Sequence, residues 1–142
     1  MRGRARMIVV VALAALFIPS LRGSQPAEKK PMVLVVYADW CPLCQRLKPA
    51  LALINERYNG KINFVLLDVT SATTTAQSRQ RARSLGLEGF FDKNYDATSL
   101  VVIRDPGGHE VFRARHDYEF EHYAKVLDRQ LDSQPHRQIK AF

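Results

Sequence analysis

Residues 33–44 read VLVVYADWCPLC, and this stretch decides most of the predicted fold. Its first part belongs to an apolar run over residues 32–37 that is too short for an ordinary helix and apolar at every position. Such a run is typical of a central strand that is buried on both faces of a sheet. Its second part holds Cys41 and Cys44, the only cysteines in the chain.

An amphipathic helix is predicted directly after the first cysteine. Apolar residues recur at helical spacing over residues 43–58, and Asn59 and Gly60 supply a left-handed stop. Residues 62–68 are predicted to form a second buried strand, and residues 74–85 a helix with a polar face. The first half of the chain is therefore interpreted as a βαβ unit followed by a further helix.

The second half is predicted to add an antiparallel hairpin and a last helix. Strands over residues 100–103 and 110–113 flank a turn at residues 105–108. Acidic residues then precede a final helix with an apolar stripe, whereas residues 89–98 fit no regular element and are expected to form an ordered loop near the site. The predicted fold class is α/β, a four-stranded mixed sheet flanked by helices in the order β-α-β-α-β-β-α.

The chain of 142 residues has room for one domain and an N-terminal extension. Three arginines precede an apolar run over residues 7–18, which is shorter than the roughly 20 residues of a membrane-spanning helix. We therefore predict a signal peptide or N-terminal anchor over residues 1–23, a linker over 24–30, the folded domain over 31–134 and a tail over 135–142. Either form of the N-terminus places the domain outside the cytoplasm, in the periplasm or cell envelope, with a membrane tether if the segment is retained.

The net charge of +7 does not indicate a nucleic-acid partner. Four of the 21 basic residues and no acidic residue lie within residues 1–23, so 17 basic residues accompany 14 acidic ones in the rest of the chain. The densest remaining basic cluster, formed by Arg79, Arg81 and Arg83, is interpreted as a solvated helix face. We therefore expect no nucleic-acid binding.

The chemistry of the chain is expected at Cys41 and Cys44. A helix N-terminus favours an anion, so the pKa of the first thiol should be lowered and its thiolate should be the nucleophile. Cys44, one turn further into the helix, would resolve the mixed disulfide that Cys41 forms. A structural disulfide and a metal site, with copper as the favoured ion, remain alternatives, although no further soft ligand lies near in the sequence. The four histidines lie far along the chain, at His109, His116, His122 and His136.

The motif around the cysteines resembles the active-site segment of the thioredoxin superfamily. The shared pattern is an apolar strand, then Ala-acid-Trp-Cys-x-x-Cys and, one to two turns later, Lys48 and Pro49. The similarity in element order extends over about residues 31–131. It implies a thioredoxin-like fold and dithiol–disulfide exchange with protein thiols and disulfides. No organic cofactor is implied, and a redox partner protein would supply or accept the electrons.

The resemblance also assigns roles to neighbouring residues. Trp40 would shield the redox pair, and the substrate would be contacted by Trp40, Pro42 and Thr98. Thr98 stands where the family carries a proline just before the third strand. Val35 occupies the position of the family's buried acid, which is thought to assist proton transfer, so that aid is absent here.

Two functions from different classes are compatible with the sequence. The first is an exported, monomeric thiol–disulfide oxidoreductase, for which the Trp-Cys context favours the reducing direction. The second is a non-catalytic module of the same fold whose cysteine pair binds a metal ion, such as copper, or a partner protein. The missing acid and the missing proline support the second. An exchange enzyme should turn over and form mixed disulfides through Cys41, whereas a metal-binding module should bind with a defined stoichiometry.

Overall fold

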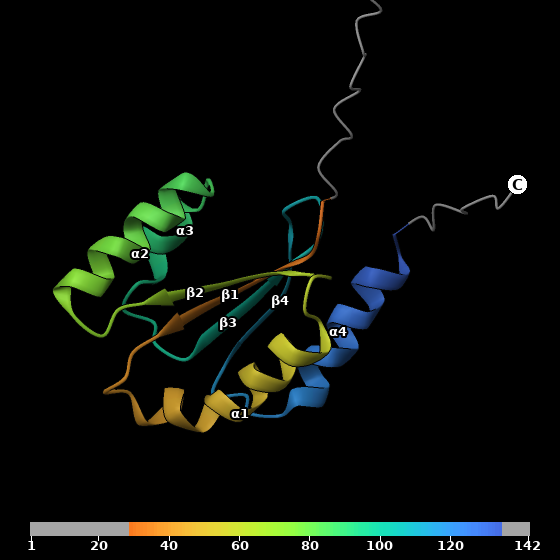
Figure 1. The fold of residues 1–142 in the computed structure, drawn as a ribbon, viewed down its shortest axis with the longest axis horizontal. Coiled ribbons are helices and arrows are strands. Elements are labelled where there is room, and N and C mark those ends of the chain that lie inside the picture. Colours follow the sequence, from red (N-terminus) through yellow and green to blue (C-terminus); the bar gives the residue numbers. More distant parts are fainter. Residues whose placement is uncertain (1–28, 135–142) are drawn as a thin grey trace, which may run out of the picture.

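Four strands and four helices make up residues 29–134, the part of the chain that the structure, a computed structural model, describes (Figure 1). In chain order they are β1 (Met32–Tyr37), α1 (Pro42–Arg57), β2 (Asn63–Asp68), α2 (Ala72–Ser84), α3 (Glu88–Asn94), β3 (Leu100–Arg104), β4 (Glu110–Arg115) and α4 (Phe120–Asp132). The predicted signal peptide or anchor (1–23) and the predicted tail (135–142) lie outside the described residues, as does most of the predicted linker (24–30). Among the residues that are described, no helix is long and apolar enough to cross a membrane.

The sheet has the strand order β2-β1-β3-β4. β1 runs parallel to β2 and antiparallel to β3, and β3 pairs antiparallel with β4 in a hairpin. The predicted four-stranded mixed sheet is therefore confirmed. β1 lies between two neighbours and is buried from Val33 onward, as its uninterrupted apolar sequence predicts.

Helices cover both faces of the sheet, α1 and α4 on one side and α2 and α3 on the other (Figure 1). Successive side chains of a strand point to opposite faces, and β1 shows this alternation. Val33, Val35 and Tyr37 pack into the core on the α1 side, whereas Leu34 and Val36 pack into the core on the α2 side. Both cysteines belong to the α1-side core, so the cysteine pair is part of the hydrophobic packing of the domain.

The loop predicted over residues 89–98 is wrong in its first half, because Glu88–Asn94 form the helix α3. Seven residues make only about two turns, too few for a helical period to show in the sequence. Short helices also gain little stability from local contacts and depend on tertiary packing. α3 obtains that packing from Phe90 and Phe91, which are both buried in the α2-side core.

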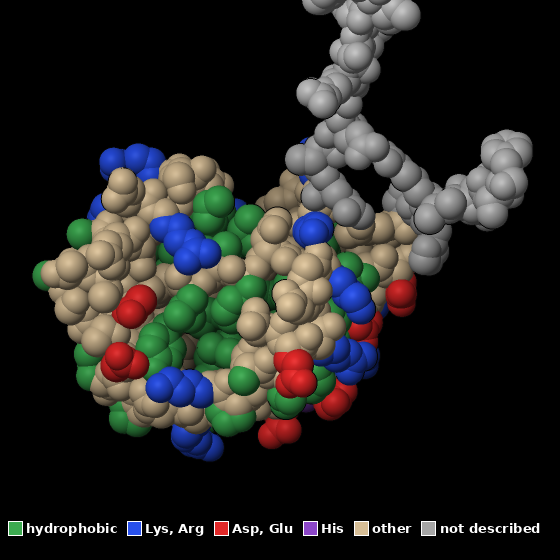
Figure 2. Space-filling model, in the orientation of Figure 1, with side chains coloured by type: hydrophobic (Ala, Val, Ile, Leu, Met, Phe, Trp, Pro, Cys, Tyr) green, Lys and Arg blue, Asp and Glu red, His purple; other side chains and the backbone are tan. Residues whose placement is uncertain are grey.

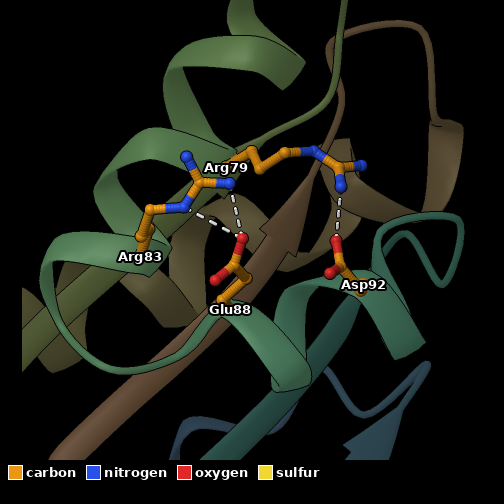
Figure 3. A network of polar contacts seen from close by, with 4 residues as sticks. All are labelled: Arg79, Arg83, Glu88 and Asp92. Carbon is orange, nitrogen blue, oxygen red and sulfur yellow. Dashed lines mark hydrogen bonds and ion pairs between the residues drawn. The ribbon is translucent and has the colours of Figure 1, made fainter.

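Two ion pairs join α3 to the preceding helix (Figure 3). Arg83 of α2 donates two hydrogen bonds to Glu88, and the guanidinium holds the pKa of that carboxyl below its usual value. Arg79 donates to Asp92 one turn further along α3, and its guanidinium lies 5.3 Å from the centre of the Phe91 ring. The side chains in these pairs are largely exposed, so we expect the buried aromatic residues to contribute most to the stability of α3.

Replacement of Phe91 by alanine should lower the free energy of unfolding by about 3–5 kcal/mol, because it removes a fully buried aromatic side chain and leaves a cavity. The matched variant Asp92→Ala removes only the exposed ion pair with Arg79 and should cost less than about 1 kcal/mol. Urea denaturation followed by circular dichroism measures both values. Equal losses in the two variants would show that the ion pairs, and not the core, hold α3 in place.

Candidate active site

The site begins where β1 ends and the chain turns into α1. Cys41 N–H donates to the carbonyl oxygen of Ala38 at 3.2 Å and closes this turn. Cys41 is the N-cap residue of α1, and Pro42 is the first residue inside the helix. A proline is well suited to that position, because the first N–H groups of a helix have no partner within it. The local sequence therefore fixes Cys41 at the mouth of the helix.

Cys41 occupies the place of a capping side chain. Its Sγ accepts a hydrogen bond from Cys44 N–H at 3.4 Å, and only 4% of the residue is exposed. Burial alone would raise the pKa of this thiol, but hydrogen bonds from the Thr98 hydroxyl, the Cys44 thiol and the first backbone N–H groups of α1 outweigh it. The net result is a lowered pKa, in agreement with the anion-binding character of a helix N-terminus.

Cys44 has the opposite properties. It is completely buried, and this burial is the main reason why its pKa rises to about 11. The Cys41 thiolate raises the Cys44 pKa further, through a hydrogen bond and through its charge, whereas backbone groups of Ala38 and Ser99 lower it. At neutral pH the pair therefore consists of a nearly buried Cys41 thiol with a lowered pKa and a completely buried, protonated Cys44 thiol. Both thiols are free in the structure.

Trp40 lies next to the reactive sulfur in the chain and is 63% exposed. Its indole Nε1 donates to the carbonyl oxygen of Thr70 at 3.0 Å, and the neighbouring Asp39 N–H donates to the Thr70 hydroxyl at 2.9 Å. Thr70 follows the end of β2 and thus ties the motif to a second strand. The indole is held in place while most of its surface stays available for contact with another molecule.

A second group of hydrogen bonds supports the same turn. Tyr37 donates its hydroxyl to Asp39 Oδ1 at 2.7 Å. Gln45, in the first turns of α1, donates to the Asp39 carbonyl oxygen at 2.7 Å and to the Tyr37 hydroxyl at 3.2 Å. Sequence analysis missed Gln45 and Thr70, because a glutamine on a helix and a threonine after a strand carry no recognisable signal of their own.

The loop before β3 forms the other wall of the site. Thr98 is buried and brings its hydroxyl to Cys41, so the structure unites these two predicted site residues. The next residue, Ser99, has a left-handed backbone with φ of 62° and donates its N–H to the Val36 carbonyl oxygen at 2.9 Å. Pro42 is exposed beside Cys41. Val35 lies in the same core as both cysteines, where it supplies no proton-transfer group.

No third metal ligand joins the cysteine pair within residues 29–134. In this part of the chain no three or more His, Cys, Asp and Glu residues are grouped so that they could hold a metal ion. His109 and His122 instead lie against carboxylates, those of Asp105 and Asp117. The described site thus consists of two thiols, one hydroxyl and backbone donors.

Known proteins resemble the chain around the same residues. Residues 23–81 match the thioredoxin family. The chloroplastic thioredoxin-like protein HCF164 of Arabidopsis thaliana is 35% identical over 82 residues, which are 54% of this chain and 30% of the relative. The thiol:disulfide interchange protein TxlA homolog of Synechocystis sp. is 42% identical over 40 residues, which are 28% of this chain and 22% of the relative. The chain therefore spans less than a third of each of these two relatives.

Solved structures show the same fold. A thiol:disulfide interchange protein of the thioredoxin family from Chlorobium tepidum superposes with a TM-score of 0.52 at 14% identity, covering 73% of this chain and 81% of its own. A thioredoxin-like protein from Porphyromonas gingivalis gives a TM-score of 0.51 at 16% identity, with coverage of 76% and 80%. The chain therefore has a thioredoxin-like fold, and its segment 23–81, which contains the Cys-x-x-Cys motif at the start of α1, is similar to the thioredoxin family.

Proposed function

We propose that this protein is a thiol–disulfide oxidoreductase that reduces disulfides of protein substrates outside the cytoplasm. The observation that carries the proposal is the opposite tuning of two adjacent thiols. The Cys41 pKa is lowered at the helix mouth, and that of Cys44 is raised to about 11 in the core. This asymmetry is what a nucleophile and a resolving thiol require.

The reaction starts with the Cys41 thiolate. Cys41 Sγ attacks one sulfur of a substrate disulfide, that disulfide breaks, and the other substrate sulfur leaves as a thiolate that takes up a proton. Cys44 then loses its proton and attacks Cys41 Sγ in the mixed disulfide, which releases the second substrate thiol. Two electrons and two protons pass from the Cys41–Cys44 dithiol to the substrate. A dithiol of a redox partner protein reverses the same steps and restores the reduced pair.

The first step prepares the second. While Cys41 is a thiolate, its charge and its hydrogen bond both raise the pKa of Cys44 and keep that thiol protonated. Once Cys41 is part of a mixed disulfide, both influences disappear, and the backbone groups of Ala38 and Ser99 continue to stabilise a Cys44 thiolate. Cys44 therefore becomes easier to deprotonate when a substrate is attached, without help from an acid at the position of Val35.

We assign the reducing direction from the Trp40–Cys41 context of the motif. Trp40, Pro42 and Thr98 surround Cys41, and we assign them to substrate contact. The basic and apolar N-terminal sequence over residues 1–23 supports export.

Alkylation of Cys41 by iodoacetamide in the reduced protein should be half-maximal at a pH below about 8.5, the ordinary value for a thiol. The thiolate is the reacting form, so a lowered pKa moves the profile to lower pH. Thr98→Val removes the hydroxyl that stabilises this thiolate and should move the midpoint upward, whereas Thr98→Ser should leave it nearly unchanged. Mass spectrometry counts the modified thiols. An unmoved midpoint in Thr98→Val would remove Thr98 from the site.

Cys44→Ala should accumulate mixed disulfides through Cys41 when the full chain is produced in its native compartment, because the resolving step is blocked. Cys41→Ala should trap almost none, because the remaining thiol is completely buried and this burial is the largest influence that raises its pKa. Non-reducing gels and mass spectrometry identify the adducts. If neither variant forms adducts and the wild-type protein binds copper with a defined stoichiometry that either substitution abolishes, the protein is a metal-binding module and not an exchange enzyme.

The reduction potential of the Cys41–Cys44 pair should lie near or below about −270 mV, as expected of a reductant. Equilibration against dithiothreitol and glutathione buffers, followed by alkylation of the remaining thiols, measures it. A value near about −120 mV would contradict the reducing direction and leave thiol–disulfide exchange intact.

A further inference from the structure

β2 is an edge strand whose outer side has no partner among residues 29–134. The N–H groups of Asn63 and Val69 donate to the β1 side, each at 2.8 Å. Backbone groups of successive residues in a strand point in opposite directions. The N–H and C=O groups of Phe64 and Leu66 and the N–H of Asp68 therefore face outward, ready to pair with another strand, whereas the Asp68 carbonyl oxygen accepts from the Ser78 hydroxyl at 2.8 Å.

The two edges of the sheet differ in a way that singles out β2. Natural proteins protect edge strands with charged side chains and irregularities. β4 has both, since it carries Glu110, Arg113 and Arg115 and its pairing with β3 contains a register shift. β2 reads NFVLLD, has only the terminal Asp68 as a charged residue, and pairs with β1 without irregularity. Its open edge is a regular and unprotected template for pairing.

An apolar groove follows this edge on the α1 side. It has a volume of about 410 Å³ and is lined mainly by Tyr37, Leu51, Phe64 and Leu66, with Lys48 at its border. Figure 2 shows hydrophobic side chains gathered along β2, between α1 and α2. A strand paired with β2 would direct every second side chain toward this groove.

The α2 side of the same edge has a mixed lining in which Arg81 is the basic side chain. Two hollows of about 440 and 280 Å³ lie there, and Arg81 lines both. Arg81 makes no ion pair within residues 29–134, whereas Arg79 and Arg83 on the same helix are paired with α3 (Figure 3). The larger hollow is otherwise lined by uncharged and mostly apolar residues, whereas the carboxylate residue Asp68 also lines the smaller one. The larger hollow, where Arg81 is the one charged lining residue, therefore favours an acidic side chain.

We propose that the outer edge of β2 binds an extended segment of a partner protein in which apolar residues alternate with acidic residues. The backbone of the segment pairs with Phe64, Leu66 and the Asp68 N–H, its apolar side chains enter the α1-side groove, and an acidic side chain on its other face meets Arg81 at the larger hollow. Because Thr70, just beyond β2, holds the Trp40 indole, such a segment runs toward the redox loop. The inference goes beyond disulfide exchange, since the binding requires neither thiol.

The test uses the full chain and a fluorescent peptide, Ser-Val-Glu-Val-Glu-Val-Glu-Ser, which contains no cysteine. We expect saturable binding in fluorescence anisotropy and at least about tenfold weaker binding of the matched peptide with lysine in place of glutamate. Hydrogen exchange followed by NMR should show slower exchange at the amides of Phe64, Leu66 and Asp68 in the complex. The amides of Val65 and Leu67, which point to β1, should change little.

Two variants probe the two components of the surface. Arg81→Glu should weaken binding at least about tenfold, whereas Lys125→Glu, an equal charge change at an exposed position of α4, should have no effect. Leu66→Pro removes one outward N–H without removing a hydrogen bond to β1, and it should also weaken binding. Arg81→Glu keeps the test decisive if Leu66→Pro does not fold.

Several results would overturn the proposal. These are no saturable binding, equal binding of the lysine peptide, or unchanged binding by Arg81→Glu. Protection of the Phe64, Leu66 and Asp68 amides in the peptide-free chain would show that residues 1–28 or a second copy already cover the edge, and light scattering separates these two occupants. Failed peptide binding with intact mixed-disulfide trapping by Cys44→Ala rejects the docking edge alone and leaves the proposed exchange function standing.

Discussion

The hydrogen bond from Cys44 N–H to Cys41 Sγ caps the helix α1 and also lowers the pKa of the Cys41 thiol. A helix begins with backbone donors that lack partners, and a capping side chain must accept from one of them. In α1 the capping side chain is the Cys41 thiol. The same hydrogen bond therefore gives a partner to a free N–H group of the helix and stabilises the Cys41 thiolate. Thr98 adds a second donor from across the sheet. The burial of Cys41, which opposes a thiolate, is thereby outweighed.

The sheet determines where these groups meet. β1 crosses the centre of the domain, and α1 starts shortly after its carboxyl end. β2 runs parallel beside it. The carboxyl ends of both strands therefore lie together, which allows Thr70 to hold Trp40 and Asp39. β3 runs in the opposite direction, so the loop that precedes it arrives at the same place. Three strands thus supply the walls of one small site.

Burial and exposure divide the site into two functional parts. Cys44 and Val35 belong to the core, where a charge is costly and a proton is retained. Trp40 and Pro42 face solvent beside Cys41. The open edge of β2 lies beyond Trp40 and extends this outer surface along the sheet. The proposed disulfide exchange and the proposed docking edge therefore occupy adjoining but separate parts of the molecule.

The sequence by itself determined the strand–cysteine–helix unit, because the apolar run over residues 32–37, the helical period after Cys41 and the Cys-x-x-Cys spacing are local properties. It also predicted the hairpin and the mixed sheet, whose strand boundaries differ from the observed ones by only one or two residues. Only the tertiary structure decided that residues 88–94 form a helix, since their stability comes from packing and not from local periodicity. The contacts of Thr70 with Trp40 and of Thr98 with Cys41 also required the folded chain, because they join residues that are far apart in the sequence. The same holds for the open edge of β2, since which strand ends a sheet is set by the pairing of all the others.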